Sequence, residues 1–229
     1  MLTVIIDLIL VAIIALCVWR GISKGLILSV AGLLAIIISF YGARAIANNY
    51  SDSFIDALTP FVGSVVDERI TEESVAHADK ENFTPQELSS IAQTVFVELG
   101  FDSDAASIKA DDAVIGVESL NQDLGNSITN IYMETLAYVF TFAIAFILIN
   151  IIFSVLLNFC NIVFKMPGLK LLNTIGGAVA GLIYGLLMVF VISWIMRFVG
   201  LIIPSESLSK TLLMSTFMDT NPVLSIMGF

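Results

Sequence analysis

The sequence predicts an all-α, multi-pass membrane protein with four transmembrane helices and an acidic, helical insertion between the second and the third. Three observations support this fold class. The chain of 229 residues is 58% hydrophobic but only 13% charged, whereas soluble domains carry about 25% charged residues. Apolar segments recur along it at lengths that approach or exceed the roughly 20 residues needed to cross a bilayer. Acidic residues gather in one long stretch between two of these segments.

The charge, cysteine and histidine content exclude several kinds of partner and site. A formal net charge of -10 argues against nucleic acid as a partner, because a strongly acidic chain repels a phosphate backbone. The two cysteines, Cys17 and Cys160, each fall near the end of an apolar segment, so we expect free thiols and no disulfide framework. His77 is the single histidine, so we expect no His-based metal or catalytic cluster. We also expect no cofactor.

The first apolar segment, residues 2–19, is interrupted by Asp7. It lacks the basic start and the cleavage site of a signal peptide, so we expect it to remain in the mature protein. A carboxylate at the bilayer centre costs about 3 kcal/mol on insertion scales. Asp7 is therefore either an interfacial residue or a buried functional carboxylate, and both interpretations stay open. Arg20 and Lys24 follow in a short basic turn.

The second apolar segment, residues 25–43, carries no charge. Gly25, Ser29 and Gly32 give it a face of small residues, which is typical of helix packing in membranes. Gly21 and Gly25 also fit the GxxxG spacing. Because we expect that pair to lie in the basic turn, it is weak evidence for packing.

The composition changes in residues 45–134, which hold 17 acidic and 3 basic residues for a net charge of -14. Thr84, Pro85 and Glu87 form a capping box that predicts the start of an amphipathic helix over residues 85–99. Its apolar positions follow at helical spacing, and Gly100 is its C-terminal cap: Leu88, Ile91, Val95 and Leu99. A second amphipathic pattern leads into the third apolar segment: Leu120, Leu124, Ile128 and Ile131.

Four aspartates lie between these two patterns: Asp102, Asp104, Asp111 and Asp112. Their spacing does not give the alternating aspartates, glycine and distal glutamate of a calcium loop. We therefore expect solvated loop and cap residues rather than a metal site.

The third apolar segment, residues 135–164, is longer than a bilayer requires, so we expect it to tilt or extend beyond the membrane. Asn150, Asn158 and Asn161 interrupt it and are candidate intramembrane polar groups. Asn158 and Asn161, near its end, either hydrogen-bond to a neighbouring helix or lie at the membrane interface, the simpler position for both. A second basic turn follows, with Lys165 and Lys170 on either side of Pro167-Gly168.

The fourth apolar segment, residues 175–196, contains a row of glycines. Gly177, Gly181 and Gly185 recur every fourth residue and so lie on nearly one helix face, which Gly176 and Ala180 widen. Membrane helices associate by close backbone approach across small residues, so we expect this face to be a packing surface.

Beyond Pro204, apolar residues stand among polar ones in a tail that predicts an amphipathic helix on the membrane surface: Leu208, Leu212, Leu213, Met214, Phe217 and Met218. Basic residues in short loops mark the cytoplasmic side, which places both basic turns there and both termini and the acidic region outside. The predicted regions are a first transmembrane hairpin, the acidic extracytoplasmic region, a second hairpin with the glycine-rich helix, and the tail: residues 1–44, 45–134, 135–203 and 204–229.

These pieces together resemble the colicin V production protein (CvpA) family of bacterial inner-membrane proteins. The resemblance rests on Arg20-Gly21 and Lys24-Gly25 after the first apolar segment, on the Pro-Gly turn with the glycine run that ends at Gly185, and on the tail. It implies a multi-pass protein of the bacterial cell membrane, associated with colicin V toxin production or envelope maintenance, and no catalytic residues. The chain departs from the family in two ways: Asn173-Thr174 stands where many members have an Asp-Arg pair, and the acidic region is long.

Two functions are consistent with these observations. The first is a non-enzymatic membrane protein that acts through membrane or envelope partners, or through self-association, in toxin production, export or envelope homeostasis. The second is a small channel or transporter formed by the four-helix bundle or its oligomer. Its path would need the polar residues named above, with Asp7 and Asn150 among them. A membrane enzyme is the least expected, because the sequence holds no catalytic constellation.

Overall fold

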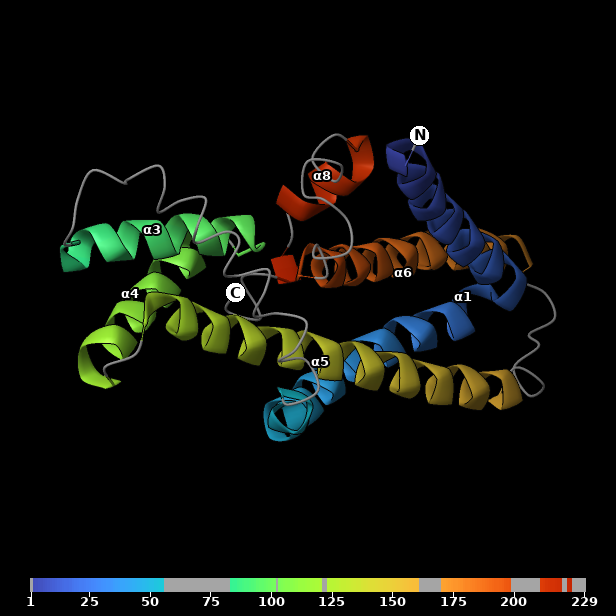
Figure 1. The fold of residues 1–229 in the computed structure, drawn as a ribbon. Coiled ribbons are helices and arrows are strands. Elements are labelled where there is room, and N and C mark those ends of the chain that lie inside the picture. The colour runs from blue at the N-terminus through green and yellow to red at the C-terminus, as the bar shows by residue number, and fades with distance from the viewer. Residues whose placement is uncertain are drawn as a thin grey trace.

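The computed structural model describes residues 2–55, 83–101, 103–120, 123–160, 170–198, 211–219 and 222–223. Every element in these ranges is a helix (Figure 1). In chain order they are α1 (Leu2–Tyr50), the short 3-10 helix η1 (Ser51–Phe54), α3 (Pro85–Glu98), α4 (Ser103–Leu120), α5 (Leu124–Cys160), α6 (Lys170–Phe198) and α8 (Leu212–Asp219).

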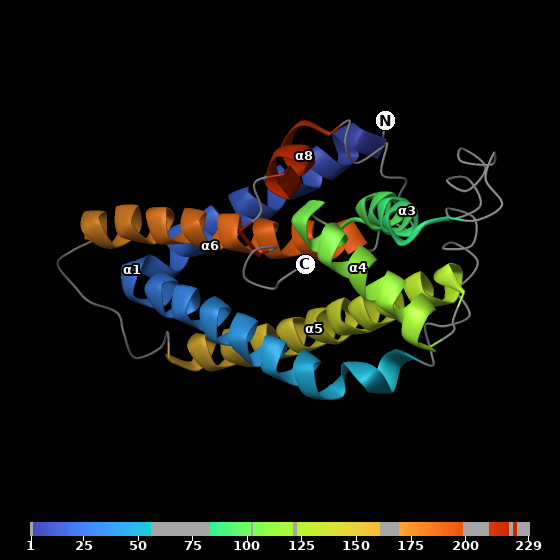
Figure 2. The ribbon, with the colours of Figure 1, turned by 90° about the vertical axis from the view of Figure 1, so that its left-hand side faces the viewer.

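Helix α1 consists of two straight parts that meet at Gly25. This residue has φ 79° and ψ 175°, a conformation that glycine adopts without the steric cost of a Cβ atom. Figures 1 and 2 show the chain turning back here, so that the second half of α1 runs beside α5. The predicted basic turn at 20–24 is therefore wrong. Arg20 and Lys24 are helical, and the reversal needs the single glycine that follows them.

Within the described ranges, three helices are long and apolar enough to cross a membrane: Val4–Phe54, Leu124–Phe159 and Leu171–Phe198. The first of them contains both predicted N-terminal segments, divided at Gly25. The predicted fourth segment lies within α6, and most of the third lies within α5. Helix α5 begins at Leu124 and so takes in the amphipathic pattern of Ile128 and Ile131.

Helix α4 lies where a solvated loop was expected, so that prediction is corrected. Asp104, Asp111 and Asp112 are helical and exposed, whereas Asp102 lies outside the described residues. The buried side of α4 is mostly alanine, the residue with the highest helix propensity: Ala106, Ala110, Ala113 and Val114. Small side chains let α4 pack closely on α3, and Ser89 of α3 donates a hydrogen bond to the Asp111 carboxylate at 2.9 Å.

The capping box of α3 is confirmed. The Thr84 hydroxyl accepts from the Glu87 backbone N–H, and the Glu87 carboxylate accepts in return from the Thr84 backbone N–H at 2.9 Å. The predicted apolar face is covered, with Ile91, Val95 and Leu99 buried. Gly100, at φ 103°, ends the helix.

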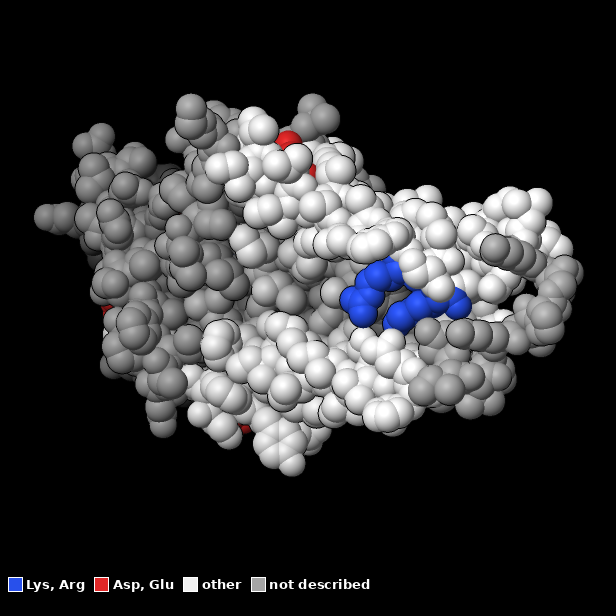
Figure 3. All heavy atoms as spheres, turned by 90° about the vertical axis from the view of Figure 1, so that its right-hand side faces the viewer, with Lys and Arg blue, Asp and Glu red and all other residues white. Residues whose placement is uncertain are grey.

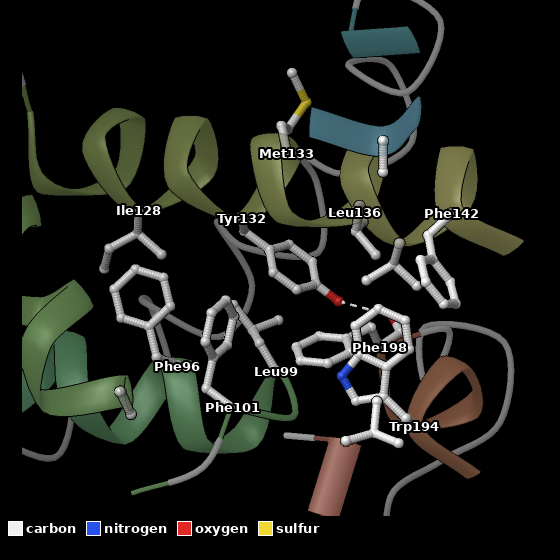
Figure 4. Packing of buried hydrophobic residues seen from close by; sticks show 14 of the residues in the cluster. Phe96, Leu99, Phe101, Ile128, Tyr132, Met133, Leu136, Phe142, Trp194 and Phe198 are labelled. Atoms are coloured by element: carbon white, nitrogen blue, oxygen red, sulfur yellow. Dashed lines mark hydrogen bonds between the residues drawn. The ribbon is translucent and has the colours of Figure 1, made fainter. Parts of the chain in front are cut away.

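The acidic region shares a hydrophobic core with the apolar helices (Figure 4). Phe101, which follows α3, is fully buried, and its ring centroid lies 5.2 Å from that of Phe96 and 5.4 Å from that of Phe198 in α6. The Tyr132 hydroxyl of α5 donates to the Phe198 carbonyl at 3.2 Å. The Arg197 guanidinium donates to the Phe101 carbonyl at 3.3 Å. Helices α3 and α4 are thus fixed to the ends of α5 and α6.

Helix α8 packs on protein, with Met214 buried between α1 and α6 in a small cluster with Leu10 and Val189. The Asp7 carboxylate accepts hydrogen bonds from the backbone N–H groups of Leu213 and Met214, at 3.1 and 3.3 Å. It therefore satisfies amides at the start of α8, which have no partner within that helix. The predicted residue Leu208 lies outside the described residues.

The capping box yields a stability prediction for α3. Thr84→Ala removes the hydroxyl that accepts from the Glu87 N–H, so we expect a local loss of about 1 kcal/mol. Hydrogen exchange of the purified protein in nanodiscs should show faster exchange over Pro85–Glu98. Thr94→Ala is the matched control: Thr94 is exposed in the middle of the same helix and should show no such loss. Equal exchange in the wild type and Thr84→Ala would contradict the assigned role of the cap.

Candidate functional site

The glycine row of α6 lies against the backbone of α1. Gly177 faces the backbone of Gly21 and Gly25, and Gly181 faces that of Cys17. An added Cβ would lie 2.6 Å from the Cys17 carbonyl oxygen at Gly181, and 3.1 Å from the Cys17 Cβ at Gly185. All three glycines are buried, as is Ala180 beside them. A side chain in the middle of this row has no space unless the two helices move apart.

Gly21 belongs to the same contact, so the low weight given to it from the sequence was wrong. A Cβ at Gly21 would collide with the Gly177 carbonyl oxygen and would lie 2.9 Å from the Gly181 Cα. Gly21 lies in the helical first half of α1, and Gly25, four residues on, is the break itself. By contrast, a Cβ at Gly32 would be 3.9 Å from the Tyr184 ring, an ordinary contact that does not require glycine.

Asn173 of α6 holds the break in α1 together. Its side-chain oxygen accepts from the Leu26 backbone N–H at 2.7 Å. This amide lacks a helical partner because the second half of α1 begins here. Ser29 of that half also donates to the Gly21 carbonyl across the break, at 3.3 Å. Asn173 thus caps a helix that begins 147 positions earlier in the sequence, and no local sequence pattern predicts this contact.

A cavity of about 100 Å³ lies beside this contact, between both halves of α1, α5 and α6. We call it the basic hollow. Its polar lining comes from three helices: Arg20, Lys24, Ser29, Asn150, Ser154 and Tyr184. Figure 3 shows basic side chains recessed among uncharged residues, while the acidic atoms visible on this face lie away from them. Lys165 lies outside the described residues, as does the side chain of Lys170.

Of the predicted intramembrane polar residues, Asn150 alone reaches this cavity within the described part of the chain. Its oxygen accepts from the Tyr184 hydroxyl at 2.8 Å. Its Nδ2 atom is buried and has no hydrogen-bond partner among the described residues. Asn158 is exposed on α5, Asn161 lies outside the described residues, and Asp7 is bound to the start of α8.

The remaining candidates do not form a second site. Cys17 is a free thiol, half-buried against α6, while the side chain of Cys160 and all of His77 fall outside the description. In the ranges that the structure covers, no three His, Cys, Asp or Glu residues lie close enough to hold a metal ion.

An all-α bundle with three apolar helices of bilayer-crossing length, packed through glycines, defines the class of α-helical membrane proteins. A comparison with models of protein families assigns the chain to one family within this class. The family model described as "Colicin V production protein" matches residues 6–78 and 113–222, and the chain belongs to this family. Comparisons with curated proteins and with solved structures gave no match.

The contact between α1 and α6 gives a testable contrast between two glycines. Alanine in place of glycine favours a helix by about 1 kcal/mol. Gly32→Ala should therefore keep or raise the melting temperature in detergent. Gly181→Ala should lower it, because its Cβ meets the Cys17 carbonyl, and Gly181→Leu should lower it further or prevent assembly. Thermal unfolding followed by size-exclusion chromatography measures both. A Gly181→Leu protein as stable as Gly32→Ala would refute the close contact.

Proposed function

We propose that this protein is a non-enzymatic, multi-pass protein of the bacterial cell (inner) membrane that acts through protein partners in colicin V production, export or envelope homeostasis. The family match over residues 6–78 and 113–222 carries the proposal, because it spans the apolar helices and the glycine contact. The exposed apolar surface of these helices fits a lipid bilayer as their surroundings: Leu8, Leu16, Ile38, Leu148 and Leu156 are among the exposed side chains.

The proposed topology has four crossings, with α1 counted twice. Each half of α1 is roughly 35 Å long at 1.5 Å per residue, enough for a hydrocarbon core of about 30 Å. The break in α1 lies at the end of the bundle where α5 ends and α6 begins, and helices α3 and α4 lie at the opposite end (Figure 1). Positive charge marks the cytoplasmic side. The break with Arg20 and Lys24 is then cytoplasmic, and the acidic helices and both termini are outside.

Loss of the gene from its native host tests the role in the cell. We expect reduced release of colicin V, or greater sensitivity to detergents and bile salts, with recovery on expression of the wild-type chain. Expression of the Gly181→Leu variant should not restore wild-type toxin release or detergent resistance, because the substitution disturbs the contact between α1 and α6. Unchanged toxin release together with an unchanged envelope would count against the proposed function.

The channel or transporter alternative has one specific observation in its favour, the basic hollow among apolar helices. A flux assay in proteoliposomes separates the two functions. Solute movement that depends on Arg20 and Lys24 would favour transport, and its absence would favour action through partners.

Cysteine labelling tests the topology. In a variant without Cys17 and Cys160, Ser103→Cys at the exposed start of α4 should react with a membrane-impermeant maleimide in spheroplasts. Ser23→Cys is the matched control, since it is exposed beside the break in α1 and should react only after lysis. The opposite labelling pattern would invert the proposed orientation.

A further inference from the structure

The basic hollow carries positive charge that the described residues do not balance. Arg20 and Lys24 are four positions apart, so they lie on one face of the first half of α1, where two like charges repel. Neither forms an ion pair with any residue in the described ranges, and no carboxylate lines the cavity there. Arg20 is exposed and Lys24 half-buried, and two basic side chains at the proposed cytoplasmic end of membrane helices attract anions. A negatively charged ligand would balance their charge.

The polar groups that line the hollow are mainly hydrogen-bond donors. The buried Nδ2 atom of Asn150 has no partner in the described structure, while its oxygen is already used by Tyr184. The guanidinium of Arg20 and the ammonium of Lys24 can only donate. Ser29 of the second half of α1 also lines the hollow, and its hydroxyl donates to the Gly21 carbonyl. A ligand that only accepts hydrogen bonds fits this set.

The volume of the cavity and its apolar wall limit which ligands can bind there. A single water needs roughly 10–15 Å³ of such space, so a cavity of about 100 Å³ holds a group of several heavy atoms. A planar guanidinium binds a phosphate through two parallel hydrogen bonds, and an ammonium adds a point charge. Phe153 and Leu157 of α5 continue the lining with apolar surface. Basic pockets between membrane helices are suited to lipid head groups.

We propose that the basic hollow binds a negatively charged phosphate group, held by Arg20, Lys24 and the Asn150 amide. The group is either the head-group phosphate of an anionic lipid or the phosphate of a small soluble molecule. Binding at this site does not require the proposed role in toxin production.

The test uses the full chain in nanodiscs of neutral phosphatidylcholine, with two kinds of added ligand. One arm replaces part of the lipid with phosphatidic acid or phosphatidylglycerol, and the other adds inorganic phosphate to the buffer. Thermal unfolding and native mass spectrometry report binding. We expect one arm to raise the melting temperature. Binding in the lipid arm alone identifies a lipid ligand, and binding in the phosphate arm supports the site with a soluble ligand.

Substitutions of the lining residues test whether the binding takes place in the basic hollow. The double variant Arg20→Gln/Lys24→Gln should bind roughly tenfold or more weakly, because charge-assisted hydrogen bonds are about twice as strong as neutral ones. Arg44→Gln is the matched control, a cation on the same helix that does not line the hollow, and should bind as the wild type does. Should the double variant misfold, Lys24→Gln and Asn150→Leu provide milder tests. No stabilisation in either arm, or equal binding by folded variants and wild type, would overturn the proposal.

Discussion

The structure depends on the direct backbone contact between the first half of α1 and the glycine face of α6. Because Gly177 and Gly181 have no side chains, α6 lies directly on the backbone of Cys17, Gly21 and Gly25. This proximity brings Asn173 to the break in α1, where it caps the second half. Gly21 and Gly181 also line the basic hollow. Packing, chain reversal and the candidate binding site are therefore consequences of one contact, and a methyl group at its centre affects all three.

The sequence predicted the features that local signals encode. The capping box of Thr84 and Glu87, the apolar segments and the row of glycines are each legible within a few turns of chain. The features that it could not predict depend on contacts between residues far apart in sequence, or on small residues that give little hydrophobic pattern. The role of Asn173 depends on a contact across 147 positions, and Gly21 gains its importance from α6. Helix α4 was missed because its buried face is mostly alanine, which gives almost no hydrophobic pattern although it favours a helix.

The acidic region is more closely integrated than its composition indicates. The family match leaves out residues 79–112, a stretch that includes α3 and Phe101. Yet Phe96 and Phe101 are fully buried with Tyr132 and Phe198, which belong to the matched part. Fourteen net negative charges occur in residues 45–134, and the described acidic side chains of α4 point outward while its alanines face α3. The segment that the family model does not match thus extends the common core and gives this end of the bundle its charge.

The hydrogen bonds from α8 to Asp7 join the first helix of the chain to the last described one. A ribosome makes α1 before α8, so this junction can form only after Leu213 and Met214 have been synthesised. The contact between Asp7 and α8 therefore forms later than the synthesis of the helices between them. A chain truncated before Leu212 would retain the glycine contact and lack this junction.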